Sequence, residues 1–127
     1  MAMYGNPNQA FEYFSDSDAI TCEAAVNLTG CTLVKLAPGG EAQRPKVTTC
    51  GAGEAPYGVA AWDVKAGQTV TILRKGVVSV KAGAAVTPGR VQSDAAGKVV
   101  PLSTGQPVGH AHADAATNTD AAVALNV

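Results

Sequence analysis

The C-terminal half of the chain contains one short pattern twice: a strand-like run, a polar turn and a second strand-like run. The first copy spans residues 56–72 and turns at Lys65-Ala66-Gly67. The second copy spans residues 107–125 and turns at Thr117-Asn118-Thr119. Small and β-branched residues on both sides of a polar turn are typical of β-hairpins. A chain that repeats such a unit is expected to fold from strands and not from helices.

Further strand signals fill the chain from residue 31 to residue 101, with Gly and Pro turns about every 8–12 residues. We expect Pro38-Gly39-Gly40 to end the first of these strands, and Gly97 to take a positive-φ turn position. Alternation in 68–74 places Val70 and Ile72 on one face. The expected strands are 31–36, 46–50, 57–63, 68–74, 77–80, 91–93 and 98–101. The pattern predicts an all-β fold, a small barrel or sandwich built from β-hairpins.

The first 18 residues have a different composition from the rest. They carry four of the six aromatic residues of the chain, among Gly, Asn, Pro, Ser and Asp: Tyr4, Phe11, Tyr13 and Phe14. We therefore expect an extended N-terminal arm over 1–18, followed by a β-rich domain over 19–127. Disordered linkers lack large apolar groups, so this segment has either of two roles. It folds over its own core, or its aromatic side chains anchor the chain to a neighbouring protein.

Composition excludes several classes of protein. A chain of 127 residues is long enough for one domain. Its nine basic residues are scattered and its net charge is −1, whereas nucleic-acid-binding proteins usually present a basic stripe. No apolar run approaches the length of a bilayer span, and no signal peptide is visible. We expect synthesis in the cytoplasm and neither nucleic acid nor membrane as a partner.

The three cysteines, Cys22, Cys31 and Cys50, match neither a CxxC pair nor a zinc-finger spacing. We interpret them as small buried apolar thiols.

The two histidines of the chain form a short ladder with an aspartate: His110, His112 and Asp114. On a strand, this spacing directs all three side chains to one face. Imidazole and carboxylate groups together can bind a divalent metal, although no fourth ligand is visible. The same residues also fit a pH-sensitive subunit contact or an ordinary polar face. We assign no metal site and keep these three residues as the candidates for one.

Catalytic signatures are lacking in the sequence. The serines lie in no G-x-S-x-G motif, and the Gly-rich segment 51–53 is followed by no Gly-Lys-Ser/Thr. The carboxylates are scattered, and several fall at expected turns, where turn formation accounts for them. We therefore predict neither an active site nor a cofactor.

Four segments carry a resemblance to a known family: 57–72, 75–83, 107–111 and 123–127. Their order of strands and regularly placed glycines resembles that of the small capsid decoration (cement) proteins of tailed bacteriophages. The resemblance implies a β-rich homotrimer on the outer surface of the assembled virion, at threefold and quasi-threefold positions. There it would stabilise the capsid by clamping adjacent major capsid proteins. The aromatic residues of the arm are not part of the shared pattern, so their role as capsid or subunit contacts is our own hypothesis.

Three other functions stay open. A glycan- or host-surface-binding β module displayed on a virion could use Trp62 and Tyr57 as a stacking platform. A metal-dependent enzyme could use the ladder of His110, His112 and Asp114. A shell subunit of a non-viral assembly would be distinguished by the structures with which the protein sediments.

Overall fold

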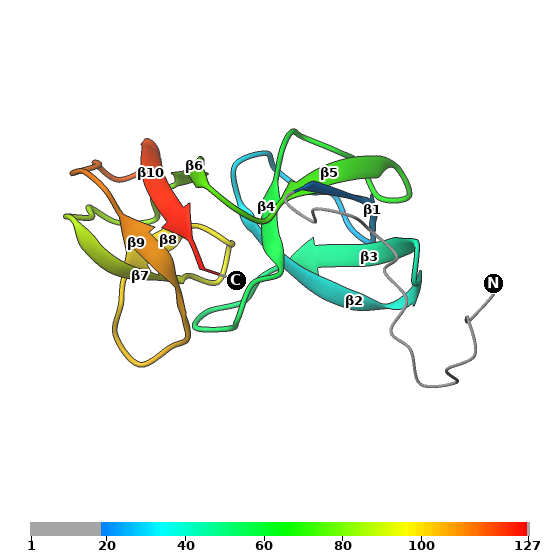
Figure 1. Ribbon diagram of the computed structural model, residues 1–127, viewed down its shortest axis with the longest axis horizontal. Helices are drawn as coiled ribbons and strands as arrows, with labels where there is room; N and C mark the ends of the chain where they lie inside the picture. The colour runs from blue at the N-terminus through cyan, green and yellow to red at the C-terminus, as the bar shows by residue number, and fades with distance from the viewer. Residues whose placement is uncertain (1–18, 127) are drawn as a thin grey trace, which may run out of the picture.

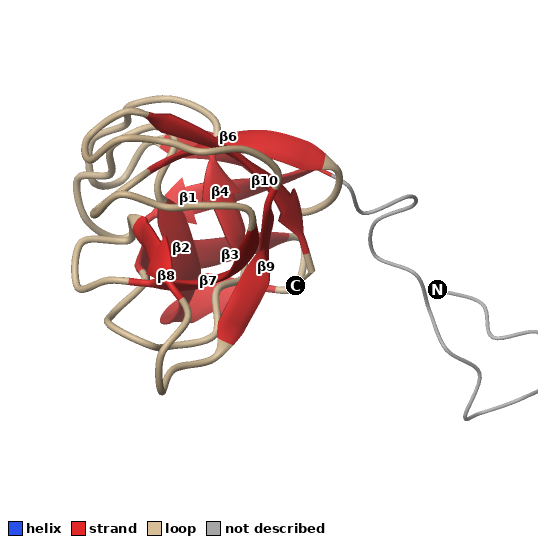
Figure 2. Ribbon diagram, turned by 90° about the vertical axis from the view of Figure 1, so that its left-hand side faces the viewer, coloured by secondary structure: helices blue, strands red, loops and turns tan. Residues whose placement is uncertain are grey.

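The computed structural model describes residues 19–126 of the chain. These residues form ten strands joined by loops and contain no helix (Figure 2). The predicted all-β fold is confirmed. The predicted N-terminal arm, residues 1–18, lies outside the described residues, so its boundary with the β-rich domain stays a prediction.

Residues 19–73 form the first lobe, a closed five-stranded barrel with the strand order β1-β3-β2-β4-β5 (Figure 1). β1 and β3 run parallel, and the other neighbouring pairs are antiparallel. Val70 and Ile72 are fully buried on one face of β5, which confirms the predicted alternation. The strands are β1 (Ala19–Ala24), β2 (Leu33–Glu41), β3 (Arg44–Thr49), β4 (Gly58–Ala60) and β5 (Thr69–Leu73).

Residues 77–125 form the second lobe, a five-stranded sheet with the order β6-β10-β9-β7-β8. It repeats the first lobe, because its four strand pairs correspond to four of the five pairs of the barrel, with each strand five places later in the chain. The sheet approaches closure only through one parallel bridge, Ala82↔Val99. At the equivalent place in the first lobe, β1 and β3 pair through Ala24↔Val47 and Glu23↔Lys46. The strands are β6 (Val77–Lys81), β7 (Gly89–Ser93), β8 (Val99–Pro101), β9 (Pro107–Ala111) and β10 (Asp120–Leu125).

The two turns of the sequence repeat have the same backbone hydrogen bonds. The Gly67 N–H donates to the Ala24 carbonyl at 2.8 Å, and the Asn118 N–H donates to the Ala82 carbonyl at 2.8 Å. Both turn residues have positive φ, 87° for Gly67 and 65° for Asn118. Gly and Asn are the residues that adopt this conformation most readily. The repeat therefore reflects a duplication of the whole five-stranded unit, of which the sequence pattern had indicated only the final hairpin.

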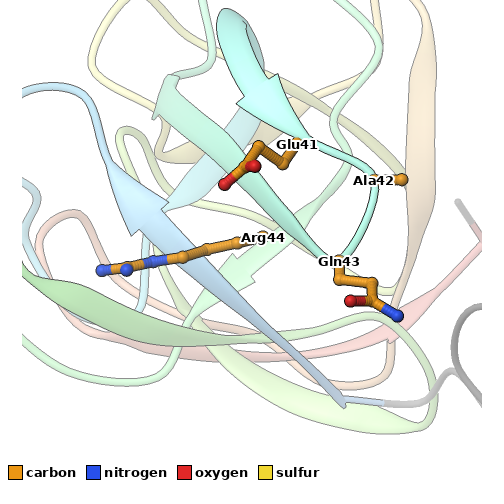
Figure 3. A pocket seen from close by; sticks show the side chains of 4 residues that line it. All are labelled: Glu41, Ala42, Gln43 and Arg44. Carbon is orange, nitrogen blue, oxygen red and sulfur yellow. The ribbon is translucent and has the colours of Figure 1, made fainter.

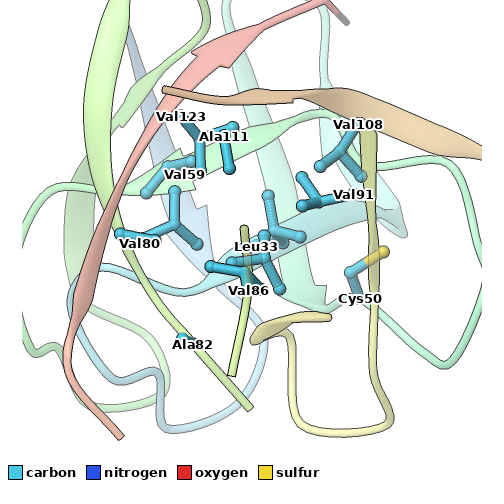
Figure 4. Packing of buried hydrophobic residues seen from close by; sticks show 12 residues of the cluster. Leu33, Cys50, Val59, Val80, Ala82, Val86, Val91, Val108, Ala111 and Val123 are labelled. Atoms are coloured by element: carbon cyan, nitrogen blue, oxygen red, sulfur yellow. The ribbon is translucent and has the colours of Figure 1, made fainter. Parts of the chain in front are cut away.

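The chain of the first lobe fills the gap in the second sheet. The Cys31 carbonyl accepts a hydrogen bond from the Lys81 N–H at 2.8 Å, and the Leu33 N–H donates to the Gly97 carbonyl at 2.7 Å. Leu33 then packs in the core of the second lobe, together with Cys50 and Val59 from the first (Figure 4). The two lobes thus share one hydrophobic cluster, while the first lobe has a second cluster of its own.

Some predicted strand boundaries are wrong. β2 continues through Pro38-Gly39-Gly40 to Glu41, where a turn had been expected. A register shift between Ala37 and Glu41 accommodates this segment, and Gly39 has φ of 91°. Such an irregularity allows a strand to contain Pro and Gly residues, which regular hydrogen-bonded pairing of strands disfavours. β4 ends at Ala60 instead of Asp63, and β1 was not predicted as a separate strand.

The interpretation of the cysteines is confirmed for Cys22 and Cys50, which are free thiols and fully buried. Burial raises the pKa of Cys22 to about 11, an effect that the positive charge of Arg74 partly offsets. The pKa of Cys50 is also raised, mainly by burial. Cys31 is half-buried, has φ of 61°, and places its sulfur 3.6 Å from the Ser79 hydroxyl.

Candidate functional site

The residues proposed to contact the capsid are not among those that the structure describes. Tyr4, Phe11, Tyr13 and Phe14 all lie in the segment 1–18. The chain enters the described region at Ala19, which pairs with Leu73 at the end of β5. The first residue of β6, Val77, follows Leu73 by four positions. The proposed arm is therefore joined to the molecule close to the chain that connects the two lobes.

The histidine ladder does not form a metal-binding group. Within residues 19–126, no cluster of three His, Cys, Asp or Glu side chains is placed to hold an ion. His110 is exposed on β9, opposite Arg90 in the register of the sheet, and this cation disfavours a metal beside it. β9 ends at Ala111, and Asp114 lies in the loop that follows. The strand alternation that would align the three side chains therefore stops after the first of them.

The two aromatic residues considered for glycan binding have different surroundings. Trp62 is half exposed, at 51%. Tyr57 packs against the core of the first lobe, and the Arg74 guanidinium lies 4.4 Å from its ring centroid. Burial raises the pKa of the Tyr57 hydroxyl, and Arg74 partly opposes this shift. Because the guanidinium covers one ring face of Tyr57, Trp62 is the better candidate for stacking on a sugar.

Large exposed apolar residues are few and come from different elements. Among the described residues they are Val26, Leu36, Trp62 and Val77. Single exposed apolar residues are normal on a soluble protein, so exposure alone identifies no interface. Val77 differs in its position, because it begins β6, which lies at the edge of its sheet. An edge strand can pair with a strand from another chain, but the first lobe already occupies part of this edge, because the Lys81 N–H donates to the Cys31 carbonyl.

The charged side chains of the described residues form local pairs of opposite sign. Glu23 lies 3.7 Å from both Arg44 and Lys46. Lys35 lies 2.9 Å from Glu54, and Lys81 lies 2.8 Å from Asp120. The hydrogen bond from Lys35, followed by that from the Gly51 N–H, lowers the pKa of Glu54. These pairs are exposed to solvent, which screens the attraction, so each contributes little to the stability of the fold.

Shallow hollows occur at the loop ends. One, of about 430 Å³, lies at the tip of the β2–β3 hairpin and is lined by Glu41, Ala42, Gln43 and Arg44 (Figure 3). Glu41 and Arg44 are register partners in the hairpin, but the Arg44 guanidinium pairs with Glu23 on β1. The lining contains no hydroxyl, thiol or imidazole group, and its one carboxylate is that of Glu41. No helix among the described residues is long and apolar enough to span a membrane.

A solved structure and a family model are both similar to this chain. The N-terminal base of the head fiber protein gp8.5 of bacteriophage phi29 has a similar fold, with a TM-score of 0.73 and 18% sequence identity. The match covers 85% of this chain and 92% of that one. Among curated protein sequences, none matches the chain. A family model described as "phage cement protein" matches residues 14–127, which include all ten strands. The chain therefore belongs to the phage cement protein family.

Proposed function

We propose that this virion structural protein binds the outside of the assembled phage capsid at threefold and quasi-threefold positions, as a homotrimer. There it stabilises the shell by clamping adjacent major capsid proteins. The observation that carries the proposal is the family match over residues 14–127. The fold that it shares with a phage head fiber base supports a location on the capsid.

The physics of a clamp requires no chemistry from the protein. A ligand that binds only the assembled shell stabilises it by mass action, by about 2.7 kcal/mol per site at a hundredfold excess over Kd. Three linked copies at a threefold vertex add avidity to contacts that are individually weak. Cyclic symmetry would also limit self-assembly to a closed trimer.

The test is co-sedimentation of the purified protein with undecorated heads. We expect saturable binding, and we expect the decorated heads to withstand a higher temperature before releasing DNA. Free major capsid protein that has not assembled should bind weakly or not at all. Equal binding to free and assembled capsid protein would contradict a clamp. Sedimentation equilibrium of the protein alone measures whether the trimer forms before attachment.

A glycan-binding function is the second candidate, favoured by the exposure of Trp62. Aromatic rings stack on the apolar faces of sugars, and the exposed half of the Trp62 side chain offers area for such a contact. A glycan array would support this function if it detected a ligand whose binding is lost in Trp62→Ala and kept in Val26→Ala. The latter variant removes another exposed apolar side chain and serves as the control.

A further inference from the structure

A second hollow, of about 410 Å³, lies where the two lobes meet. Its walls come from the β1–β2 loop of the first lobe, and from β6, the β7–β8 turn and the β9–β10 turn of the second. The lining residues are Thr29, Thr32, Lys81, Ala96, Lys98 and Asn118. This lining contains two ammonium groups and three polar uncharged side chains, and no carboxylate.

The duplication shows how this hollow differs from the equivalent place in the first lobe. The parallel pair Ala24↔Val47 corresponds to the bridge Ala82↔Val99. The residues immediately before these are Glu23 and Lys46 in the first lobe, and Lys81 and Lys98 in the second. The first lobe thus places opposite charges at the two positions, with Glu23 within 3.7 Å of Lys46. The second lobe places like charges there.

The described carboxylates near the hollow neutralise only part of the positive charge of its two lysines. Asp120 lies 2.8 Å from Lys81. The Lys98 ammonium donates to the Asn118 amide oxygen at 3.2 Å, and among the described residues it forms no ion pair. Asp94, in the same turn as Lys98, accepts hydrogen bonds from the backbone N–H groups of Ala96 and Lys98. Lys98 therefore lies beside the hollow with a neutral partner.

The geometry points to a carboxylate as the missing ligand: we propose that the hollow receives an Asp or Glu side chain from a neighbouring capsid protein. A carboxylate between Lys98 and Lys81 would accept charge-assisted hydrogen bonds, which are stronger than those between neutral groups. The Asn118 amide and the Thr29 hydroxyl supply further donors at the rim. The site is pre-organised, because Lys81 and Leu33 tie the two lobes together through backbone hydrogen bonds beside it. The identity of the partner rests on the proposed function.

The site itself is tested without a capsid, by titrating the ¹⁵N-labelled full chain with glutarate at constant ionic strength and recording amide shifts. We expect saturable shifts concentrated at Thr29, Lys98 and Asn118. Lys98→Gln should weaken binding about tenfold, since one charge-assisted hydrogen bond is lost. Asp120→Asn should tighten it several-fold, because it removes the carboxylate that competes for Lys81. The matched control is Lys65→Gln, at an exposed position in the turn of the first lobe.

Absence of saturable shifts, or an equal effect of Lys98→Gln and Lys65→Gln, would overturn the site. The partner is tested with undecorated heads, by comparing Lys98→Glu with Lys65→Glu. We expect the first variant to bind at least tenfold more weakly than the second. If the two variants bind heads equally well, the capsid carboxylate is refuted although glutarate binds. If the unmodified protein does not bind heads at all, the proposed function fails while the glutarate result stands on its own.

Discussion

At the scale of single residues, the duplicated glycines show why the sequence repeat has its form. Gly58 and Gly109 occupy equivalent positions in β4 and β9, where each approaches the neighbouring strand. A Cβ on Gly58 would lie 2.6 Å from the Leu73 carbonyl oxygen, and one on Gly109 would overlap the Ala124 carbonyl oxygen. The spacing of these glycines could be read from the sequence. The sequence does not show why these two positions require glycine, because the requirement comes from a strand that begins more than ten residues later.

Gly109→Ala should destabilise the protein by at least about 2 kcal/mol, because φ is 152° and no space exists for the new methyl group. The matched control is Gly76→Ala, at which φ is 90° but the surrounding space is open. The free energy of unfolding of that variant should fall by only about 1–2 kcal/mol, because only backbone strain is added. Urea unfolding of both variants measures the difference. Equal losses would show that the close approach to Ala124 does not constrain the fold.

The cysteines give a second prediction at this scale. Cys31 should react first with a thiol reagent at pH 8, because it is half-buried, whereas Cys22 and Cys50 are fully buried. Their raised pKa values further reduce the reactive thiolate. We expect Cys31 to be labelled rapidly in the native protein and the other two only on unfolding, as mass spectrometry of labelled peptides would show. Rapid labelling of Cys22 would contradict its burial in the barrel.

At the scale of elements, local patterns predicted the hairpins and missed how they combine. The turn around Gly97 and the alternation in β5 depend on neighbouring residues, and both were predicted correctly. The bulge in β2 was missed, because Pro38-Gly39-Gly40 has the local signature of a turn. The correspondence between β1 and β6 was missed as well. The two strands have similar patterns of buried side chains, but few of their residues are identical. Comparing residues 19–28 with 77–86 for the alternation of apolar and polar residues could have indicated it.

The lobe junction can be tested on β2, which carries two leucines in different surroundings. Leu33 is fully buried in the core shared by both lobes, whereas Leu36 is 52% exposed. Leu33→Ala should cost about 2–5 kcal/mol, since it leaves a cavity. Leu36→Ala should change stability by less than about 0.5 kcal/mol, as surface substitutions do. Denaturant unfolding, followed by amide signals from each lobe, should show that Leu33→Ala weakens both. A loss of stability in only one of the two lobes would contradict a shared core.

At the scale of the whole molecule, the connection between the two lobes is the feature that matters most for the proposed clamp. The two lobes form one body with a shared core, so a load applied to one lobe is transmitted to the other. The family could be predicted from the order of glycines and strands in the sequence. The contact surface could not, because the arm is distinguished by composition alone, and the inter-lobe hollow is formed by residues far apart in the chain.

Deletion of residues 1–18 should weaken attachment to heads while leaving the unfolding of the β-rich domain unchanged. The reason is that the proposed anchors, Tyr4, Phe11, Tyr13 and Phe14, all lie in that segment. Replacing the four by Ser in the full chain is the matched variant, because it keeps the length of the arm. Binding isotherms on heads and a thermal melt measure the two properties. Unchanged capsid occupancy in both variants would refute the arm as an anchor.

The central claim is that this protein attaches to the outer surface of the assembled shell, in threes, between major capsid proteins. Electron cryo-microscopy of undecorated heads, imaged before and after addition of the purified protein, tests it most directly. We predict new density outside the shell at the threefold and quasi-threefold positions, into which three copies of the two-lobed fold can be placed. New density at other positions, or none at saturating protein, would contradict the claim.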